Sequence, residues 1–297
     1  MTHNLLRKKL KQNNKEKLRQ VFLPNLLNMK KNTLILCAIL SVIGLGLAIP
    51  FDLSFSQTIY DQSNFLGLFG EAFGELPGIL VGVFGCAALL LTYKKDSKYS
   101  KISSFIFGSI FLILLSIMAA FLPSHYIEMP TVVVVIVALV YAALALFIVK
   151  KTPESKYPML RRLAWVAVLT LLTETLIINL VKFGWSRIRF RDLVDNTELF
   201  TAWFIPNGFS WNTDHMSFPS GHVGNASVIL FITLLPSAYL KLSKYKNALL
   251  IGSFVWIILI AISRIIMGAH FISDTIVGMW VTIISLIVYQ KRFKIEQ

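Results

Sequence analysis

The sequence has little charge and little cysteine. Charged residues make up 15% of its 297 positions and hydrophobic residues 56%, whereas a soluble protein carries roughly a quarter charged residues. The two cysteines, Cys37 and Cys86, both lie in apolar runs and form neither a disulfide framework nor a zinc-ligand pattern. This balance indicates a membrane protein, with both cysteines as packing residues.

The net charge of +14 does not indicate a nucleic-acid-binding protein. Long apolar runs divide the basic residues into short clusters, so no continuous basic face is available for a duplex. We expect no nucleic-acid partner and explain the charge by membrane topology instead.

Long apolar runs are what the sequence has most of. A helix needs ~20 apolar residues to cross the ~30 Å hydrocarbon core, and lipid excludes open sheet edges. The sequence therefore predicts an all-α, polytopic membrane bundle of about eight helices, near residues 33–53, 77–93, 102–122, 131–149, 163–181, 223–240, 247–267 and 271–289.

Basic residues predict the orientation of these helices. They gather before residue 32 and in 94–101, 150–162, 241–246 and 291–294. The segments 54–76 and 123–130 contain none. By the positive-inside rule, both termini are cytoplasmic in a multi-pass protein of the cell membrane. The basic residues that do not fit this rule are Lys182, Arg187, Arg189, Arg191 and Arg264.

Residues 1–32 form a basic cytoplasmic segment with two open interpretations. The segment is either an interfacial helix bound to anionic lipid headgroups or a basic tail that only fixes orientation. It lacks the features of a secretory signal peptide. We expect the transmembrane domain to span 33–290 and a cytoplasmic tail to span 291–297.

Three clusters of polar residues lie at the outer ends of consecutive predicted helices. They run from Lys182 to Arg191, from Ser217 to His222 and from Ser263 to Asp274. Phosphate esters need cations and N–H donors around their oxygens. Lys182, Arg189 and Arg264 can supply the charge. The entry to a helix at Ser220 and Gly221 can supply backbone N–H groups.

Two histidines can supply the remaining chemistry. His270 and Asp274 are four residues apart, so a helix would place them on one face. A hydrogen bond from the ring to Asp274 would leave the other ring nitrogen free to attack phosphorus. His222 could then protonate the leaving oxygen. Glu174, inside a predicted helix, is expected to be protonated or functional, and His215 and Asp214 to be loop residues.

Together the clusters resemble the signature of the type 2 phosphatidic acid phosphatase family, of the superfamily that includes vanadium haloperoxidases. That signature is Lys-x6-Arg-Pro, Pro-Ser-Gly-His and Ser-Arg-x5-His-x3-Asp. The chain matches it over about 163–289, except that Phe190 replaces the proline. The departure leaves open whether Arg189, Arg187 or Arg191 reaches the phosphate, although the spacing favours Arg189.

The resemblance implies a six-helix core, a site on the outer face, a phosphohistidine intermediate, and neither a metal nor another cofactor. It implies His270 as nucleophile, His222 as general acid and Asp274 as the partner that orients His270. The residues that it implies, or leaves as candidates, for phosphate binding are Lys182, Arg189, Arg264, Ser220 and Gly221, then Arg187, Arg191 and Ser263. One helical hairpin would be additional to the core.

The expected substrate is a lipid phosphomonoester or diphosphate, such as undecaprenyl diphosphate, phosphatidate or phosphatidylglycerol phosphate. One alternative is a phosphatase of soluble esters or a haloperoxidase. Another is a lipid or anion transporter, although no internal repeat supports it. Haem binding is disfavoured because His222 and His270 lie at helix ends beside arginines. The oligomeric state is left open.

Overall fold

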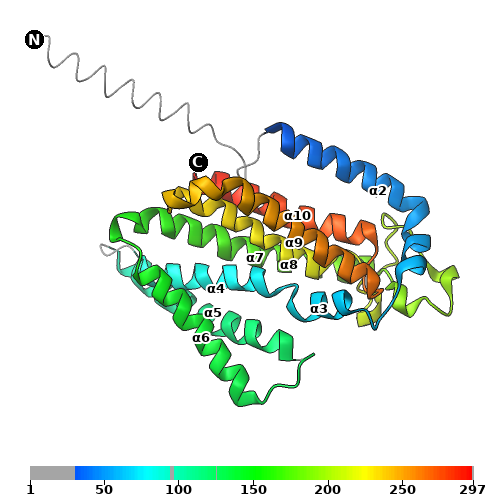
Figure 1. Cartoon of the computed structure of the whole chain (residues 1–297), viewed down its shortest axis with the longest axis horizontal. Coiled ribbons are helices and arrows are strands. Elements are labelled where there is room, and N and C mark those ends of the chain that lie inside the picture. The colour runs from blue at the N-terminus through cyan, green and yellow to red at the C-terminus, as the bar shows by residue number, and fades with distance from the viewer. Residues whose placement is uncertain (1–30, 94–96, 125, 296–297) are drawn as a thin grey trace, which may run out of the picture.

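The computed structural model describes residues 31–93, 97–124 and 126–295. Over these residues the chain is helical and contains no strand, which confirms the predicted all-α bundle (Figure 1). The α-helices are α2 Lys31–Ile59, α3 Phe65–Phe73, α4 Leu76–Leu91, α5 Lys98–Ser124, α6 Thr131–Lys150, α7 Tyr157–Trp185, α8 Gly221–Ser227, α9 Lys246–Ile266 and α10 Ile272–Arg292. The 3-10 helices are η2 Glu154–Lys156, η3 Phe190–Asp192, η4 Thr197–Leu199, η5 Thr213–His215, η6 Val228–Ser237 and η7 Leu240–Tyr245.

Seven helices in the described part of the chain are long and apolar enough to cross a membrane. One of them, Phe65–Leu91, joins α3 to α4 and is longer than the predicted 77–93. The predicted helix 223–240 is instead α8 followed by η6 over Gly221–Ser237. A 3-10 helix rises ~2.0 Å per residue and an α-helix ~1.5 Å. This short segment therefore reaches ~30 Å, about the thickness of the hydrocarbon core.

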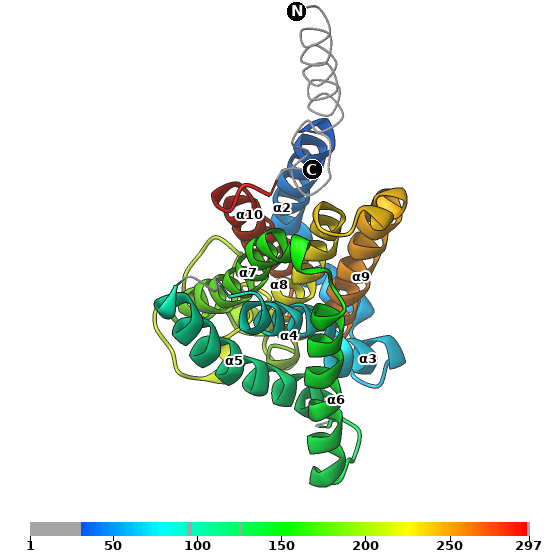
Figure 2. The same ribbon diagram turned by 90° about the vertical axis from the view of Figure 1, so that its left-hand side faces the viewer.

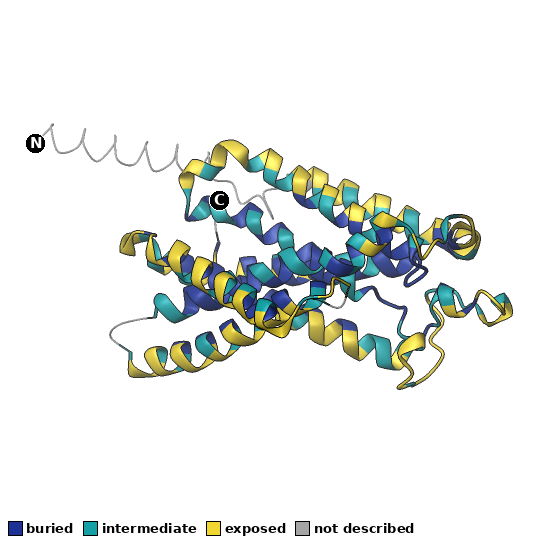
Figure 3. Cartoon of the chain, turned by 60° about the horizontal axis from the view of Figure 1, so that its bottom comes forward, coloured by how far each residue is buried: buried dark blue, intermediate teal, exposed yellow. Residues whose placement is uncertain are grey.

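The outward-facing side chains are apolar. Isoleucine, leucine, valine and phenylalanine side chains of α2, α5 and α6 are exposed, whereas the buried residues lie in the interior of the bundle (Figure 3). In the most apolar stretch of α2, only 6% of the residues are buried inside the bundle. Apolar surface of this extent requires a lipid environment, so the protein is a polytopic membrane protein.

Helix α4 lies in the middle of the bundle, in contact with α5, α6, α7 and α8 (Figure 2). Glycines allow its neighbours to approach closely. A Cβ at Gly78 of α4 would lie 2.2 Å from the carbonyl oxygen of Asn225, and one at Gly278 of α10 would lie 2.3 Å from that of Ser220. The start of α8 is therefore enclosed by α4 and α10, which fixes the position of its first residues.

One end of the bundle brings the predicted motifs together. Helices α7 and α9 end there, and α8 and α10 begin there. We call this the cavity end. The basic segments 150–156 and 241–246 lie at the opposite end, where Thr152 is hydrogen-bonded to Tyr239. The interpretations of the basic segment 1–32 fall almost entirely outside the described residues.

Candidate active site

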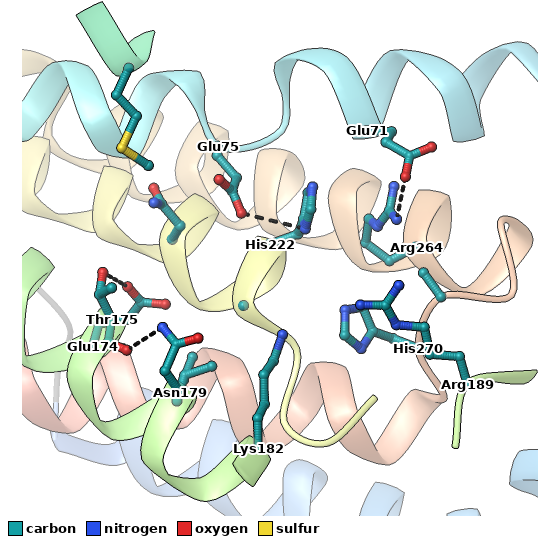
Figure 4. A pocket seen from close by; sticks show the side chains of 15 residues that line it. Glu71, Glu75, Glu174, Thr175, Asn179, Lys182, Arg189, His222, Arg264 and His270 are labelled. Carbon is teal, nitrogen blue, oxygen red and sulfur yellow. Dashed lines mark hydrogen bonds and ion pairs between the residues drawn. The ribbon is translucent and has the colours of Figure 1, made fainter. Parts of the chain in front are cut away.

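A cavity of about 290 Å3 opens at the cavity end. It is lined by residues from α3, the α3–α4 turn, α5, α7, α8 and α9 and from the loops after α7 and α9 (Figure 4). The polar and charged lining residues are Glu71, Glu75, Glu174, Thr175, Asn179, Lys182, Arg189, Gly221, His222, Asn225, Arg264 and His270.

Three cations face this cavity, as the sequence predicted for Lys182, Arg189 and Arg264. Lys182 lies in the last turn of α7 and Arg264 in the last turn of α9. The Nε atom of Arg189 and the Nε and Nη1 atoms of Arg264 are buried, with no hydrogen-bond partner among the described residues. Buried guanidinium donors without partners favour an anionic ligand.

Arg187 does not line the cavity, because it is bound elsewhere. Its Nη1 lies 2.5 Å from Asp274 Oδ1 and its Nη2 lies 3.1 Å from Asp52 Oδ2. The guanidinium also lies 4.1 Å from the ring centre of Phe271. Arg187 is 1% exposed, so its role in this structure is to hold α2 and α10 together.

Arg191 also lies outside the cavity lining, next to Asp192, with 3.9 Å between Nε and Oδ2. Phe190, which replaces the family's proline, is buried against the rings of Tyr60 and Phe271. It thus anchors the chain between Arg189, which enters the cavity, and Arg191, which does not. Of the three candidate arginines in this turn, only Arg189 reaches the cavity.

The ring of His270 is oriented by a backbone carbonyl. Its Nδ1 lies 2.6 Å from the carbonyl oxygen of Ser217. Because a carbonyl can only accept, Nδ1 carries the proton and Nε2 keeps its lone pair. Burial lowers the pKa of His270 to about 3, against a smaller opposing effect of Asp274. The ring is therefore neutral at neutral pH.

The predicted hydrogen bond between His270 and Asp274 is wrong in its geometry. Asp274 Oδ2 lies 3.8 Å from the ring Nδ1, which is too long for a hydrogen bond. The same oxygen instead accepts hydrogen bonds from Ser217 Oγ at 2.5 Å and from the Phe271 amide at 2.9 Å. Asp274 therefore acts on His270 indirectly, because it fixes Ser217, whose carbonyl oxygen binds the ring.

His222 lies at the start of α8, on the side of the cavity nearer to α4. Its Nδ1 lies 3.4 Å from Oε1 of Glu75. Figure 4 shows the two imidazole rings at the same cavity, with Lys182, Arg189 and Arg264 around it. His215 and Asp214 do not line the cavity, in agreement with the loop roles predicted for them.

Two predicted phosphate-binding serines have structural roles here. Ser220 is the N-cap of α8, and its Oγ accepts a hydrogen bond from the Val223 amide at 3.3 Å. Ser263 donates from Oγ to the Ile260 carbonyl oxygen at 2.8 Å. Neither serine lines the cavity, whereas Gly221 does. A Cβ at Gly221 would lie 3.5 Å from Lys182 Nζ, so the start of α8 and this cation are neighbours.

Two acidic residues of the site, Glu71 and Glu75, were not predicted from the sequence. Glu71 of α3 lies 3.1 Å from Nη2 of Arg264, and Glu75, the N-cap residue of α4, faces His222. The available signal was an i, i+4 pair of glutamates in the segment 54–76, which contains no Lys or Arg. Asp52 was missed as well, although an acidic residue inside a membrane helix indicates function or pairing.

The carboxylates do not form a metal site in the described part of the chain, where no cluster of three or more potential ligands has suitable geometry. Glu174 is 2% exposed and lies against α8, where a Cβ at Gly224 would approach its Oε1 to 2.4 Å. It also accepts a hydrogen bond from Thr175 Oγ1 at 3.1 Å. The site is thus a cavity lined by both cations and carboxylates, in which Glu71 is paired with Arg264 and Glu75 faces His222.

Residues 163–296 match the model of the PAP2 superfamily, and this range contains all three predicted motifs. Comparison with curated proteins gives no match, and neither does comparison with solved structures. The superfamily supports phosphoester hydrolase activity. The part of the chain that carries the cations, both imidazoles and Asp274 is therefore similar to the PAP2 superfamily, in line with its resemblance to the type 2 phosphatidic acid phosphatases.

Proposed function

We propose that this protein is a membrane lipid phosphatase that hydrolyses a phosphomonoester or diphosphate through a phosphohistidine on His270. The observation that carries the proposal is the His270 ring, held at Nδ1 by the Ser217 carbonyl, in one cavity with three cations. Its free Nε2 is a nucleophile, and unpartnered donors of Arg189 and Arg264 are ready for a phosphate. No step of the proposal uses a metal ion.

The reaction has two steps. Nε2 of His270 donates its electron pair to phosphorus as the bond to the leaving oxygen breaks, and protonated His222 gives that oxygen its proton. Water then attacks the phosphohistidine, neutral His222 takes a proton from the water, and the P–N electron pair returns to Nε2. Lys182, Arg189 and Arg264 stabilise the phosphate oxygens in both transition states.

A lipid substrate is supported by the side on which the cavity opens. Met118 of α5 lines the cavity and is 40% exposed on the apolar surface of the bundle. Thr175 and Asn179 of α7 also line it and are exposed. Polar side chains on a membrane-facing helix surface are unusual. We infer that a phosphate headgroup enters between α5 and α7 while its hydrocarbon chain stays in the bilayer.

The orientation proposed here places the cavity on the outer face of the cell membrane. The basic segments at the opposite end of the bundle favour a cytoplasmic location for that end. The candidate substrates, which form the panel for the test, are an isoprenoid diphosphate such as undecaprenyl diphosphate, phosphatidate and phosphatidylglycerol phosphate.

The test is phosphate release by the purified protein in detergent, with and without EDTA. We expect release that resists EDTA, falls by at least about a hundredfold in His270→Ala and His222→Ala, and persists in His215→Ala, whose side chain lies outside the cavity. Wild type should also retain an acid-labile phosphoryl group that His270→Ala lacks. Folded wild-type protein that releases no phosphate from any panel member would overturn the proposal.

A further inference from the structure

Glu75 lies outside the segment that matches the PAP2 superfamily, yet it faces an imidazole of the site. It is the N-cap residue of α4, with φ −84° and ψ −19°, and its side chain forms no cap hydrogen bond. Its Oε1 instead lies 3.4 Å from Nδ1 of His222. The carboxylate is thus directed to the ring rather than to its own helix (Figure 4).

The position of Glu75 is set by close helix contacts on both sides of it. A Cβ at Gly70 of α3 would lie 1.9 Å from Ser263 Oγ of α9. On the other side, a Cβ at Gly78 of α4 would lie 2.2 Å from the Asn225 oxygens. The turn between α3 and α4 is therefore pressed against α9 and α8. This packing holds Glu71 against Arg264 and Glu75 against His222.

The chemistry proposed for His222 needs a nearby anion. A general acid must carry its proton before the leaving oxygen departs. The cations Lys182, Arg189 and Arg264, from α7, the following turn and α9, line the same cavity as His222 (Figure 4). Positive charges this near oppose a positive charge on the ring. The start of α8 opposes it too, because the N-terminal end of a helix dipole is positive.

Three carboxylates could offset this opposition. Glu71 is engaged by Arg264, and Glu174 is packed against Gly224 and hydrogen-bonded to Thr175. Among the described residues, Glu75 is the carboxylate that contacts His222, with 3.4 Å between Oε1 and the ring Nδ1.

We propose that Glu75 is a positioning residue for His222, so that the α3–α4 turn completes the active site of the PAP2 segment. The carboxylate holds Nδ1 of the ring, keeps Nε2 directed to the leaving oxygen, and stabilises the imidazolium. Glu75 is thus the carboxylate that pairs with the His222 ring and orients it. This inference rests on the proposed phosphatase function.

The test compares Glu75→Gln, Glu75→Asp and the exposed outer-loop control Glu128→Gln with wild type. Glu75→Gln should lower kcat/KM for an alkyl lipid phosphate by roughly tenfold to a hundredfold, a value typical of residues that orient a reacting group. It should also move the basic limb of the pH profile to lower pH, because an uncompensated imidazolium loses its proton sooner. Glu75→Asp should restore much of that limb, and Glu128→Gln should match wild type.

A second readout separates positioning from general damage. An aryl phosphate such as p-nitrophenyl phosphate has a good leaving group that needs little protonation, so its kcat/KM should fall less in Glu75→Gln than that of the lipid. Equal losses on both substrates with an unmoved basic limb would overturn the inference while leaving the phosphatase function intact. Wild type without phosphate release would instead remove the function on which the inference rests. A thermal unfolding midpoint close to wild type shows that the variants are folded.

Discussion

Arg187 and Asp274 form an ion pair that is closed to solvent, with 2.5 Å between Nη1 and Oδ1 and side-chain exposures of 1% and 0%. The other amino group of Arg187 lies 3.1 Å from Asp52 of α2, whose carboxylate also accepts hydrogen bonds from the amide and hydroxyl of Ser273. Helix α2, loosely packed along most of its length, is thus bound firmly at the start of α10. The orientation of His270 depends on this network through Asp274 and Ser217.

Replacing Asp52 should therefore affect both stability and catalysis. Asp52→Asn keeps the shape of the side chain but leaves Arg187 with one anion instead of two. A hydrogen bond to a charged group contributes about 2 kcal/mol when buried, and we expect a loss of stability of about that size with reduced kcat. The unfolding midpoint in detergent measures the first effect. Asp61→Asn, in the exposed turn after α2, should change neither, and an unchanged Asp52→Asn would show that the network does not support the site.

The neighbouring arginines should differ sharply in function. Arg189→Ala removes a buried guanidinium whose Nε has no partner, and we expect kcat/KM to fall by about a hundredfold or more, as for other preorganised donors. Arg191→Ala removes a cation that is 26% exposed beside Asp192 and should cost less than about threefold, within the usual range for exposed ion pairs. Phosphate-release kinetics on both variants check this. Comparable losses would mean that the turn around Phe190 rearranges when substrate binds.

The pH dependence of stability should include His270. Burial lowers the pKa of His270 to about 3 in the folded protein, whereas an unfolded histidine titrates near ~6.5. Between these values the unfolded state binds more protons, so stability falls as pH decreases through that window and is fully present above it. His270→Gln removes this contribution, so its unfolding midpoint should decline less between pH 7 and 4. Parallel declines would show that His270 is not buried as a neutral ring.

The pH profile of activity should reflect the same lowered pKa of His270. Because kcat/KM reports the groups of the free enzyme, and burial lowers the pKa of His270 there to about 3, we expect His270 to cause no acid limb of kcat/KM at pH 5–6. An acid limb in that range that persists when the substrate phosphate is already ionised would contradict this.

The sequence predicted the location of the matched segment 163–296 well, because the residues that carry its chemistry form short local motifs. Lys182, Arg189, His222, Arg264 and His270 each lie at the end of an apolar run, and matching helix ends bring them to one cavity. The roles of single residues were harder to predict. Arg187 and Arg189 are chemically alike and two positions apart, and only the ion pairs with Asp52 and Asp274 separate them.

What the sequence could not predict depends on long-range packing. The contact of Glu75 with His222 joins positions far apart in the chain, and it arises from glycine contacts of α3 with α9 and of α4 with α8. The 3-10 winding of η6 was missed too, because apolar periodicity does not distinguish it from an α-helix over so short a run. Helices α3 and α4, which lie outside the matched segment 163–296, thus contribute to the site through long-range contacts that no local motif predicts.

The substrate route that we infer between α5 and α7 predicts that substrate chain length matters at Met118. In Met118→Trp, a larger and more rigid side chain would narrow the opening between α5 and α7. We expect KM for a long-chain lipid phosphate to rise by roughly tenfold, the scale of steric discrimination in apolar sites, and KM for a short-chain analogue to change little. Ile117→Trp is the matched control, since Ile117 is 48% exposed on α5 and does not line the cavity. Equal effects of Met118→Trp on both substrates would argue that the headgroup reaches His270 from the aqueous side of the cavity end instead.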